Sequence, residues 1–222
     1  MNRSVLAIFV KSPEFSPVKT RLAASIGQEK AVHFYELALS ATAAVAREAR
    51  RHLTDLDVVW AVAEKESLSL PRWNQFPTVF QGDGGLGERL HHVYESLLQK
   101  YATVSLIGAD SPHIDIDRLV NALVCTRNHR EVGFVLGTTD DGGFYYFGGG
   151  LSLSRETWTS VEYSSHSTAV DLSDGLEIIG PIEHLAKDFD IDVLEDLRRL
   201  SGLERRKIPE QIALIDWARK LE

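Results

Sequence analysis

The sequence has little of what disulfide-rich, membrane-spanning or polymer-binding proteins need. Cys125 is the only cysteine among 222 residues, so neither an intramolecular disulfide nor a thiolate metal cluster can form. The N-terminal apolar run, residues 5–10, is far too short to cross a bilayer. Basic residues number 24 against 32 acidic ones, which argues against a surface that neutralises a nucleic-acid backbone. We therefore expect a cytoplasmic protein with no membrane span and no nucleic-acid polymer as partner.

The remaining composition is typical of a globular protein. Hydrophobic residues make up 44% of the chain, and a chain of this length buries roughly 70% of the surface that its unfolded form exposes. The sequence contains no repeat, low-complexity tract or linker. These features predict a single domain over residues 1–222 and leave its oligomeric state open.

Strand-forming and helix-forming segments alternate along the chain. Apolar runs predict strands at 5–10, 57–63, 78–80, 104–107, 132–136 and 144–147, with a further extended segment at 176–179. Helical spacing follows Gly27 and recurs at 86–100, 116–128, 193–200 and 209–221. This alternation predicts a three-layer α/β/α fold with a mostly parallel, mixed sheet. Ligands bind such sheets at the carboxyl ends of the strands, and Lys11, Gly82, Asp110 and Asp140 each follow a predicted strand.

A basic, proline-stiffened loop follows the first predicted strand. Lys11, Lys19 and Arg21 supply three cations within residues 11–22. Arginine can hold a phosphate through two parallel hydrogen bonds, and lysine acts as a point charge. The segment is no Walker loop, because it lacks the glycines and the Gly-Lys-Ser/Thr ending. Phosphate binding and an ordinary solvated loop both fit these residues.

A glycine-rich segment, residues 81–89, leads into a predicted helix. Glycines such as Gly82 and Gly87 let a backbone approach a ligand closely, and a helix N-terminus offers free N–H groups to anions. Arg89 stands at the start of this helix. Nucleotide binding is one interpretation, and a tight surface turn is the other.

Asp110 stands where a buried strand ends, in Gly108-Ala109-Asp110-Ser111-Pro112. A carboxylate there suits Mg²⁺ or Mn²⁺, which bind through one or two carboxylates together with substrate phosphates. An aspartate that starts a turn explains the same residues. For His113 we expect a structural or exposed role.

Two further acidic segments follow. Asp141, in the segment 140–144, could accept hydrogen bonds from substrate hydroxyls, although a plain hairpin turn has the same sequence. The acids of residues 188–192 alternate along an extended segment. Asp192 has capping-box spacing to Glu195, whereas Asp190 has no such explanation.

The serines and histidine of residues 164–167 form a polar loop without the features of a nucleophile elbow. We find no credible Ser-His-Asp set. Covalent catalysis is therefore not part of our interpretation.

Taken together, these segments resemble a bacterial family of GT-A-like proteins related to nucleotide-diphospho-sugar transferases and small nucleotidyltransferases. The resemblance rests on residues 9–11, 17–22, 87–89, 108–112, 141–144, 190–192 and 195–197 and on their order. It implies a GT-A, or spore-coat-protein-like, fold. Two positions depart from the family pattern: Ser16 replaces a usual glycine, and Gly85 stands where an aspartate often precedes Leu-Gly-Glu-Arg.

The resemblance also implies roles for particular residues. The nucleotide and its phosphates are expected at Lys11, Lys19, Arg21, Gly82, Gly87 and Arg89; Mg²⁺ or Mn²⁺ at Asp110 and Asp190; and the catalytic groups at Asp110 and Asp141, the latter near the transferred group or the acceptor.

The expected function is metal-dependent transfer from a nucleotide-sugar to a small-molecule acceptor that the sequence does not identify. Sugar-transferring GT-A enzymes generally carry Asp-x-Asp where this chain has Gly108-Ala109-Asp110. Nucleotidyl transfer to a small phosphorylated acceptor is therefore an alternative. The changes at Ser16 and Gly85 leave open a third possibility, a non-catalytic nucleotide-binding protein.

Overall fold

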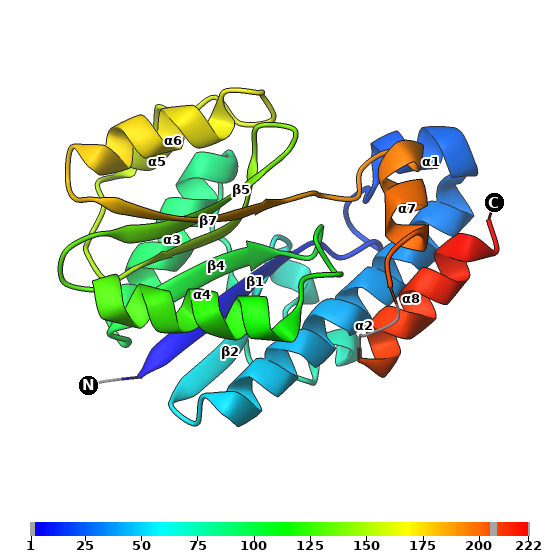
Figure 1. The fold of residues 1–222 in the computed structure, drawn as a ribbon, viewed down its shortest axis with the longest axis horizontal. Coiled ribbons are helices and arrows are strands. Elements are labelled where there is room, and N and C mark those ends of the chain that lie inside the picture. The colour runs from blue at the N-terminus through cyan, green and yellow to red at the C-terminus, as the bar shows by residue number, and fades with distance from the viewer. Residues whose placement is uncertain (1–2, 205–207, 222) are drawn as a thin grey trace.

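The computed structural model describes residues 3–204 and 208–221, in which helices cover both faces of a seven-stranded sheet (Figure 1). The strands are β1 (Ser4–Val10), β2 (Leu56–Val62), β3 (Thr78–Phe80), β4 (Thr103–Gly108), β5 (Phe134–Thr139), β6 (Phe144–Gly149) and β7 (Ile182–Asp188). Their order is β3-β2-β1-β4-β6-β5-β7. Strand β6 pairs antiparallel with β4 and β5, and every other pairing is parallel. The predicted mixed, mostly parallel sheet is confirmed.

The helices are α1 (Thr20–Ile26), α2 (Gln28–His52), α3 (Leu86–Leu98), α4 (Ile116–His129), α5 (Arg155–Thr159), α6 (Thr168–Glu177), α7 (Leu194–Ser201) and α8 (Pro209–Arg219). Short 3₁₀ helices, η1 (Lys65–Ser67) and η2 (Pro71–Trp73), join β2 to β3. The alternating side chains of β1 show why helices lie on both faces. Leu6 and Ile8 pack with α2 and α4, while Val5 and Ala7 pack with α3, α5 and α6.

A third apolar cluster lies beyond one end of the sheet. There α1, α7 and α8 gather against α2 (Figure 1), with Leu22, Phe34, Leu197 and Leu214 buried among them. Ile191 is also fully buried in this cluster. The cluster therefore fixes helix α1 and the chain after β7 beside the carboxyl ends of β1 and β4.

The sequence prediction was wrong in the region before β7. Residues 176–179 were expected to be extended, but Leu176 and Glu177 end helix α6 and the strand begins only at Ile182. Strand β7 was not predicted because it is an edge strand whose Glu183, His184 and Lys187 are exposed, so it lacks an apolar run.

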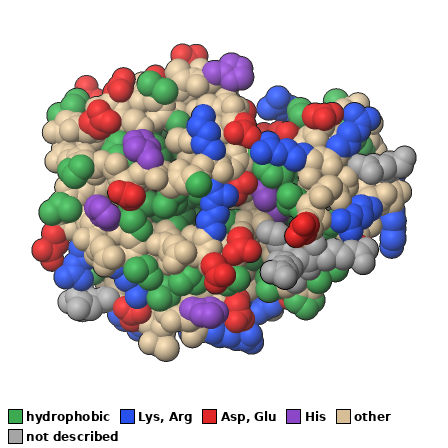
Figure 2. Space-filling model, viewed as in Figure 1, with side chains coloured by type: hydrophobic (Ala, Val, Ile, Leu, Met, Phe, Trp, Pro, Cys, Tyr) green, Lys and Arg blue, Asp and Glu red, His purple; other side chains and the backbone are tan. Residues whose placement is uncertain are grey.

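Strands β1, β4 and β5 run in the same direction and end at one edge of the sheet. Lys11, Asp110 and Asp140 follow these ends, as the sequence predicted. On the face shown in Figure 2, acidic and basic side chains are interspersed. Among the described residues, no helix combines the length and the apolar character that a membrane crossing requires.

Candidate active site

Two adjoining cavities open at the carboxyl ends of β1 and β4. The acidic cavity, of about 620 Å³, is lined by four aspartates: Asp110, Asp141, Asp190 and Asp192. The basic cavity, of about 660 Å³, is lined by Lys11, Lys19, Arg21 and Arg89. Phe9, Arg21, Leu86, Gly108, Asp110, Ser164 and Asp192 line both. The two cavities are therefore parts of one cleft, with Asp110 at their boundary.

Lys19 holds the acidic side of this cleft together. Its Nζ lies 2.5 Å from Asp110 Oδ1 and 2.9 Å from Asp192 Oδ1, and it donates to the carbonyl of Ile191 at 2.7 Å. The side chain of Lys19 is only 3% exposed. Burial alone would lower the pKa of Lys19, but the carboxylates of Asp110 and Asp192 outweigh that effect and raise the pKa above its usual value. Lys19 is therefore a charged, internal partner of two aspartates.

The backbone at Lys19 places this ammonium. Lys19 is the N-cap residue of α1 and has the left-handed conformation, with φ 48°. A non-glycine residue adopts this conformation at some energetic cost. The resemblance placed Lys19 at the phosphates. In the structure, Lys19 lines the basic cavity, but its ammonium contacts the carboxylates of Asp110 and Asp192. A phosphate in this cavity would therefore share the charge of Lys19 with those two carboxylates.

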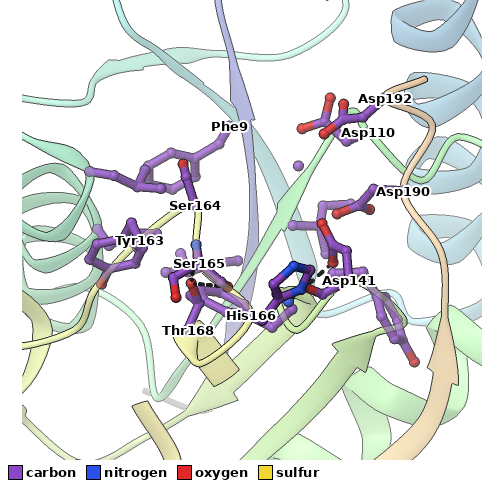
Figure 3. Close-up of a pocket in the computed structure, with 18 of the residues that line it drawn as sticks. Phe9, Asp110, Asp141, Tyr163, Ser164, Ser165, His166, Thr168, Asp190 and Asp192 are labelled. Atoms are coloured by element: carbon purple, nitrogen blue, oxygen red, sulfur yellow. Dashed lines mark hydrogen bonds between the residues drawn. The ribbon is translucent and has the colours of Figure 1, made fainter. Parts of the chain in front are cut away.

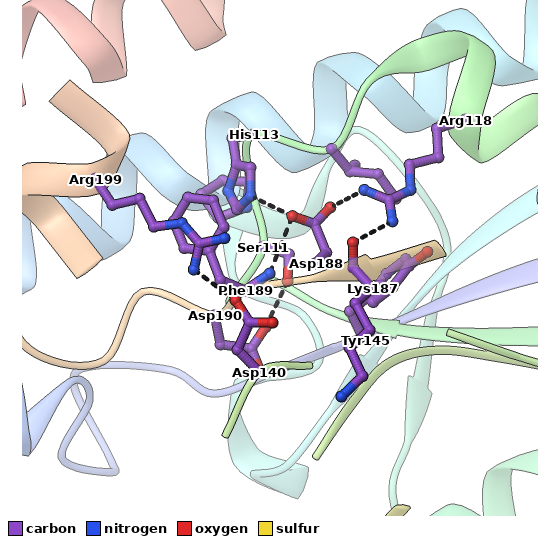
Figure 4. A network of polar contacts seen from close by, with 12 residues as sticks. Ser111, His113, Arg118, Asp140, Tyr145, Lys187, Asp188, Phe189, Asp190 and Arg199 are labelled. Carbon is purple, nitrogen blue, oxygen red and sulfur yellow. Dashed lines mark hydrogen bonds and ion pairs between the residues drawn. The ribbon is translucent and has the colours of Figure 1, made fainter. Parts of the chain in front are cut away.

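Asp190 is held by a polar network at the end of β7 (Figure 4). Its Oδ1 accepts a hydrogen bond from Ser111 Oγ at 2.5 Å, and the N–H of Ile191 donates to the carbonyl of Asp110. Two residues earlier, Asp188 pairs with the buried His113 at 2.9 Å and with Arg118 at 2.7 Å. Of the two roles expected for His113, structural or exposed, the structure shows the first: the buried ring ties the chain before Asp190 to the loop after β4.

The free energy of unfolding should fall as pH rises through the range in which Asp190 is protonated in the folded protein and ionised in the unfolded chain. Burial, and next the charge of Asp110, raise the pKa of Asp190 from 3.8 to about 7. Between these values the folded state binds the extra proton, so each pH unit removes up to about 1.4 kcal/mol of unfolding free energy.

In urea unfolding of metal-free protein, we expect the wild type to lose roughly 1.5 kcal/mol more than Asp190→Asn between about pH 5 and about pH 6.5. The asparagine side chain does not titrate, so the free energy of unfolding of this variant lacks the contribution of Asp190. Parallel pH profiles for the two proteins would contradict the assignment.

Asp141 lies in the tight turn between β5 and β6. Its Oδ1 accepts hydrogen bonds from Thr139 Oγ1 at 2.6 Å and from the N–H of Gly143 at 3.1 Å. Burial raises the pKa of Asp141, but the hydrogen bond from Thr139 and those from the backbone bring the pKa below its usual value. Asp141 is therefore ionised at neutral pH, with one oxygen engaged by the turn.

The glycine-rich segment lines the basic cavity, but with other glycines than the sequence suggested. Gly84 and Gly85 line the basic cavity, whereas Gly82 and Gly87 do not. At Gly87 a Cβ would lie 2.6 Å from the carbonyl oxygen of Trp158, so this glycine permits close packing of α3 on α5. Arg89 lines the basic cavity and donates from Nε to the carbonyl of Gly84.

Sequence reasoning missed two parts of the cleft. Asp192 was interpreted as a helix cap, but the N–H groups of Asp192 and Val193 are capped by Asp196, and the Asp192 carboxylate faces Lys19. Residues 164–167 were interpreted as a polar loop, yet Ser164, Ser165 and His166 line the acidic cavity, with His166 beside Asp141 (Figure 3). In both cases the partners are distant in sequence, and only Asp-rich spacing hinted at Asp192.

The carboxylates fit a metal ion that arrives with phosphates better than one held in a cage of protein ligands. In the described parts of the chain, no group of three or more His, Cys, Asp or Glu side chains is arranged to hold a metal. Asp110 and Asp190 nevertheless line the same cavity. Mg²⁺ usually keeps several waters and binds one or two carboxylates together with substrate phosphates. Two aspartates are therefore enough protein ligands for such an ion.

Comparison with solved structures shows the class of fold. A protein from Desulfovibrio desulfuricans G20, whose name proposes a nucleotide-diphospho-sugar transferase, aligns over 100% of this chain and 97% of its own, with a TM-score of 0.81 and 23% identity. A cytidylyltransferase from Leptospira borgpetersenii covers 100% and 95%, with a TM-score of 0.55 and 13% identity. CMP:2-keto-3-deoxy-manno-octonic acid synthetase in complex with CTP covers 90% and 97%, at 0.50 and 11%. The chain has the nucleotide-diphospho-sugar transferase-like fold.

The family itself follows from the sequence match. Residues 40–165, more than half of the chain, match the family model described as "Uncharacterized protein conserved in bacteria (DUF2064)", and the chain belongs to this family. No curated protein matches the chain. The predicted resemblance to bacterial GT-A-like proteins is confirmed.

Proposed function

We propose that this protein is a metal-dependent transferase that uses a nucleotide-sugar donor. The observation that carries the proposal is the division of one cleft into a cationic and an anionic half that meet at Asp110. The cations of the basic cavity suit the phosphates of a nucleotide. The fold is shared with a protein named as a nucleotide-diphospho-sugar transferase, with a cytidylyltransferase and with a synthetase in complex with CTP, which supports a nucleotide as ligand.

In this proposal the donor phosphates lie between Arg21 and Asp110. Bound Mg²⁺ or Mn²⁺, held by Asp110 and Asp190, would neutralise charge on the leaving phosphate. Arg21 reaches both cavities with a side chain that is 68% exposed, so it can contact the same phosphate from the other side. Fixed charges of this kind stabilise a leaving group without reorganisation during the reaction.

The acceptor hydroxyl approaches from the acidic cavity. Its oxygen forms a bond to the anomeric carbon, the bond from that carbon to the phosphate oxygen breaks, and the electron pair leaves with the nucleoside diphosphate. Asp141 is ionised, and because the turn engages its Oδ1, Oδ2 remains to take the hydroxyl proton. Positioning of the two reactants in adjoining cavities supplies the remaining acceleration.

The experiment that tests this function is calorimetric titration of the protein with nucleotide-sugars and nucleoside triphosphates, each with and without Mg²⁺ or Mn²⁺. We expect binding that requires the metal, and release of nucleoside diphosphate when an acceptor is present. Absence of metal-dependent binding across the nucleotide set would refute the proposal. Binding without turnover on any acceptor would favour a nucleotide-binding protein.

Nucleotidyl transfer is the second candidate. A single aspartate, Asp110, follows the end of β4, and a cytidylyltransferase is among the structures that share the fold. The products released in the presence of an acceptor distinguish the two reactions. Nucleotidyl transfer consumes a triphosphate and releases pyrophosphate instead of a nucleoside diphosphate.

Arg21→Ala should weaken nucleotide binding by about 1.5–3 kcal/mol, the range for a hydrogen bond to a charged group. Arg21 lies 3.7 Å from Asp192, and Lys19 is closer to that carboxylate, at 2.9 Å. Because Asp192 keeps Lys19 as its partner, the fold should tolerate the change. Calorimetry measures the affinity. Arg51→Ala is the matched control, since Arg51 is 72% exposed and lies outside both cavities. Equal affinities for the two variants would remove Arg21 from the site.

A further inference from the structure

The two cavities differ in the charge of their walls. The acidic cavity has four aspartates and one arginine, Arg21, whereas the basic cavity has four cationic side chains and two aspartates. Lys19 pairs with Asp110 and Asp192 and is already engaged by them, so a phosphorylated ligand in the acidic cavity would face carboxylates with Arg21 as the one cation among the described residues that line it. Like charges in contact discriminate strongly against the wrong ligand.

The wall opposite the aspartates is built for hydroxyl groups. Ser164, Ser165 and Thr168 line the acidic cavity across from Asp110 and Asp190, and His166 lines it beside Asp141 (Figure 3). This segment is pinned in place: the N–H of Ala169 donates to the carbonyl of Gly142 at 2.8 Å, and Thr168 Oγ1 donates to the carbonyl of Glu162.

Gly142 is required for this arrangement. It has φ +92°, and a Cβ there would lie 2.2 Å from the carbonyl oxygen of His166. Only glycine combines that backbone conformation with such close contact. The turn that carries Asp141 and the segment 163–168 therefore form one unit.

His166 has a defined orientation in this unit. Its Nδ1 lies 2.8 Å from the carbonyl oxygen of Asp141. Because a carbonyl only accepts, Nδ1 carries a hydrogen, and the neutral ring offers Nε2 as an acceptor. Asp141 and His166 thus provide two acceptors for hydroxyl protons, and the serines add hydroxyl groups of their own.

Much of the remaining wall is apolar. Phe9, Leu86, Leu90, Phe144 and Tyr163 line the same cavity. A ligand with an apolar face and hydroxyl groups at its rim, such as a sugar ring or a polyol, matches both kinds of surface.

We propose that the acidic cavity binds an uncharged, hydroxyl-bearing acceptor, that it discriminates against phosphorylated acceptors, and that His166 is one of its acceptor-binding residues. The assignment as acceptor rests on the proposed transferase function. The choice of an uncharged ligand rests on the cavity itself.

Matched pairs of ligands test the proposal: glycerol and glycerol 3-phosphate, and a free hexose and its 6-phosphate. Saturation-transfer NMR measures their affinities for the full-length protein, first alone and then with Mg²⁺ and nucleotide. We expect the uncharged member of at least one pair to bind about tenfold or more tightly than its ester. His166→Asn retains a donor in place of Nδ1 and loses Nε2, so it should weaken that uncharged ligand about fivefold.

His184→Asn is the control, because His184 is exposed on β7 and lies outside both cavities. Esters that bind as tightly as their parents in both pairs, or a complete lack of binding by the uncharged compounds, would overturn the proposal. Failure of the transferase function has a separate signature, the absence of metal-dependent nucleotide binding in calorimetry. Binding of the uncharged ligands without nucleotide would support the cavity assignment even then.

Discussion

Lys19→Met is expected to lower the free energy of unfolding by about 3 kcal/mol, the low end for breaking a buried ion pair. The ammonium of Lys19 is almost fully buried and lies within 3 Å of Asp110 and Asp192. Its loss leaves two carboxylates facing each other beside Asp190. The effect stays at the low end because Asp110 and Asp192 are 51% and 37% exposed and can regain water. Urea unfolding at neutral pH measures it.

Two further variants give this prediction its control. Lys30→Met makes the same substitution at an exposed position on α2 and should leave the free energy of unfolding within about 0.5 kcal/mol of the wild type. The double variant Lys19→Met/Asp110→Asn removes one of the stranded charges and should recover part of the loss. If Lys19→Met unfolds at the same urea concentration as Lys30→Met, Lys19 does not hold the acidic side of the cleft together.

The strands and their common edge could be predicted because they depend on local composition. The apolar runs at β1 and β4 are buried on both faces, and the direction of parallel strands brings the following loops to one edge. Lys11, Asp110 and Asp140 could therefore be placed at one edge from the sequence. Strand β7 could not be predicted, because an edge strand with exposed charged residues has no apolar signature.

The role of Lys19 could not be predicted for a different reason. Its partner Asp192 is separated from it by 173 positions in the sequence, and the pairing depends on α1 and α7 packing into one apolar cluster. From the sequence, phosphate binding and an ordinary solvated loop both fitted Lys19, and neither interpretation includes a buried pairing with carboxylates. The segment 163–168 was missed in the same way, since its contact with Gly142 exists only in the folded chain.

The network around Asp188 and the pairing of Lys19 have a common consequence. Both fix the backbone of residues 188–192 against the loop after β4, one through His113 and Arg118 and the other through Ile191 and Asp192. Asp110 and Asp190 are thereby placed together before any ligand arrives. Such pre-organisation reduces the entropy lost on binding, which favours a metal site completed by the ligand's own phosphates.

Asp110→Asn should therefore reduce metal-dependent nucleotide affinity on the order of 100-fold, or about 2.8 kcal/mol at 1.4 kcal/mol per tenfold. The asparagine oxygen can still accept a hydrogen bond from Lys19, and Asp192 still pairs with that lysine, so the fold should persist. What is lost is a negative charge at the boundary of the two cavities. Asp192 also lines both cavities, but its two carboxylate oxygens face Lys19 and Arg21, and Asp190 lines only the acidic cavity.

Asp140→Asn is the matched control for this substitution. Asp140 is also 51% exposed and is also ion-paired, with Arg199 at 2.6 Å, but it lines neither cavity. Calorimetry with and without Mg²⁺ should show that Asp110→Asn loses the metal-dependent part of the binding and that Asp140→Asn keeps it. If both variants retain it, charge at the end of β4 does not hold the metal, and the phosphates must be bound by the cations of the basic cavity alone.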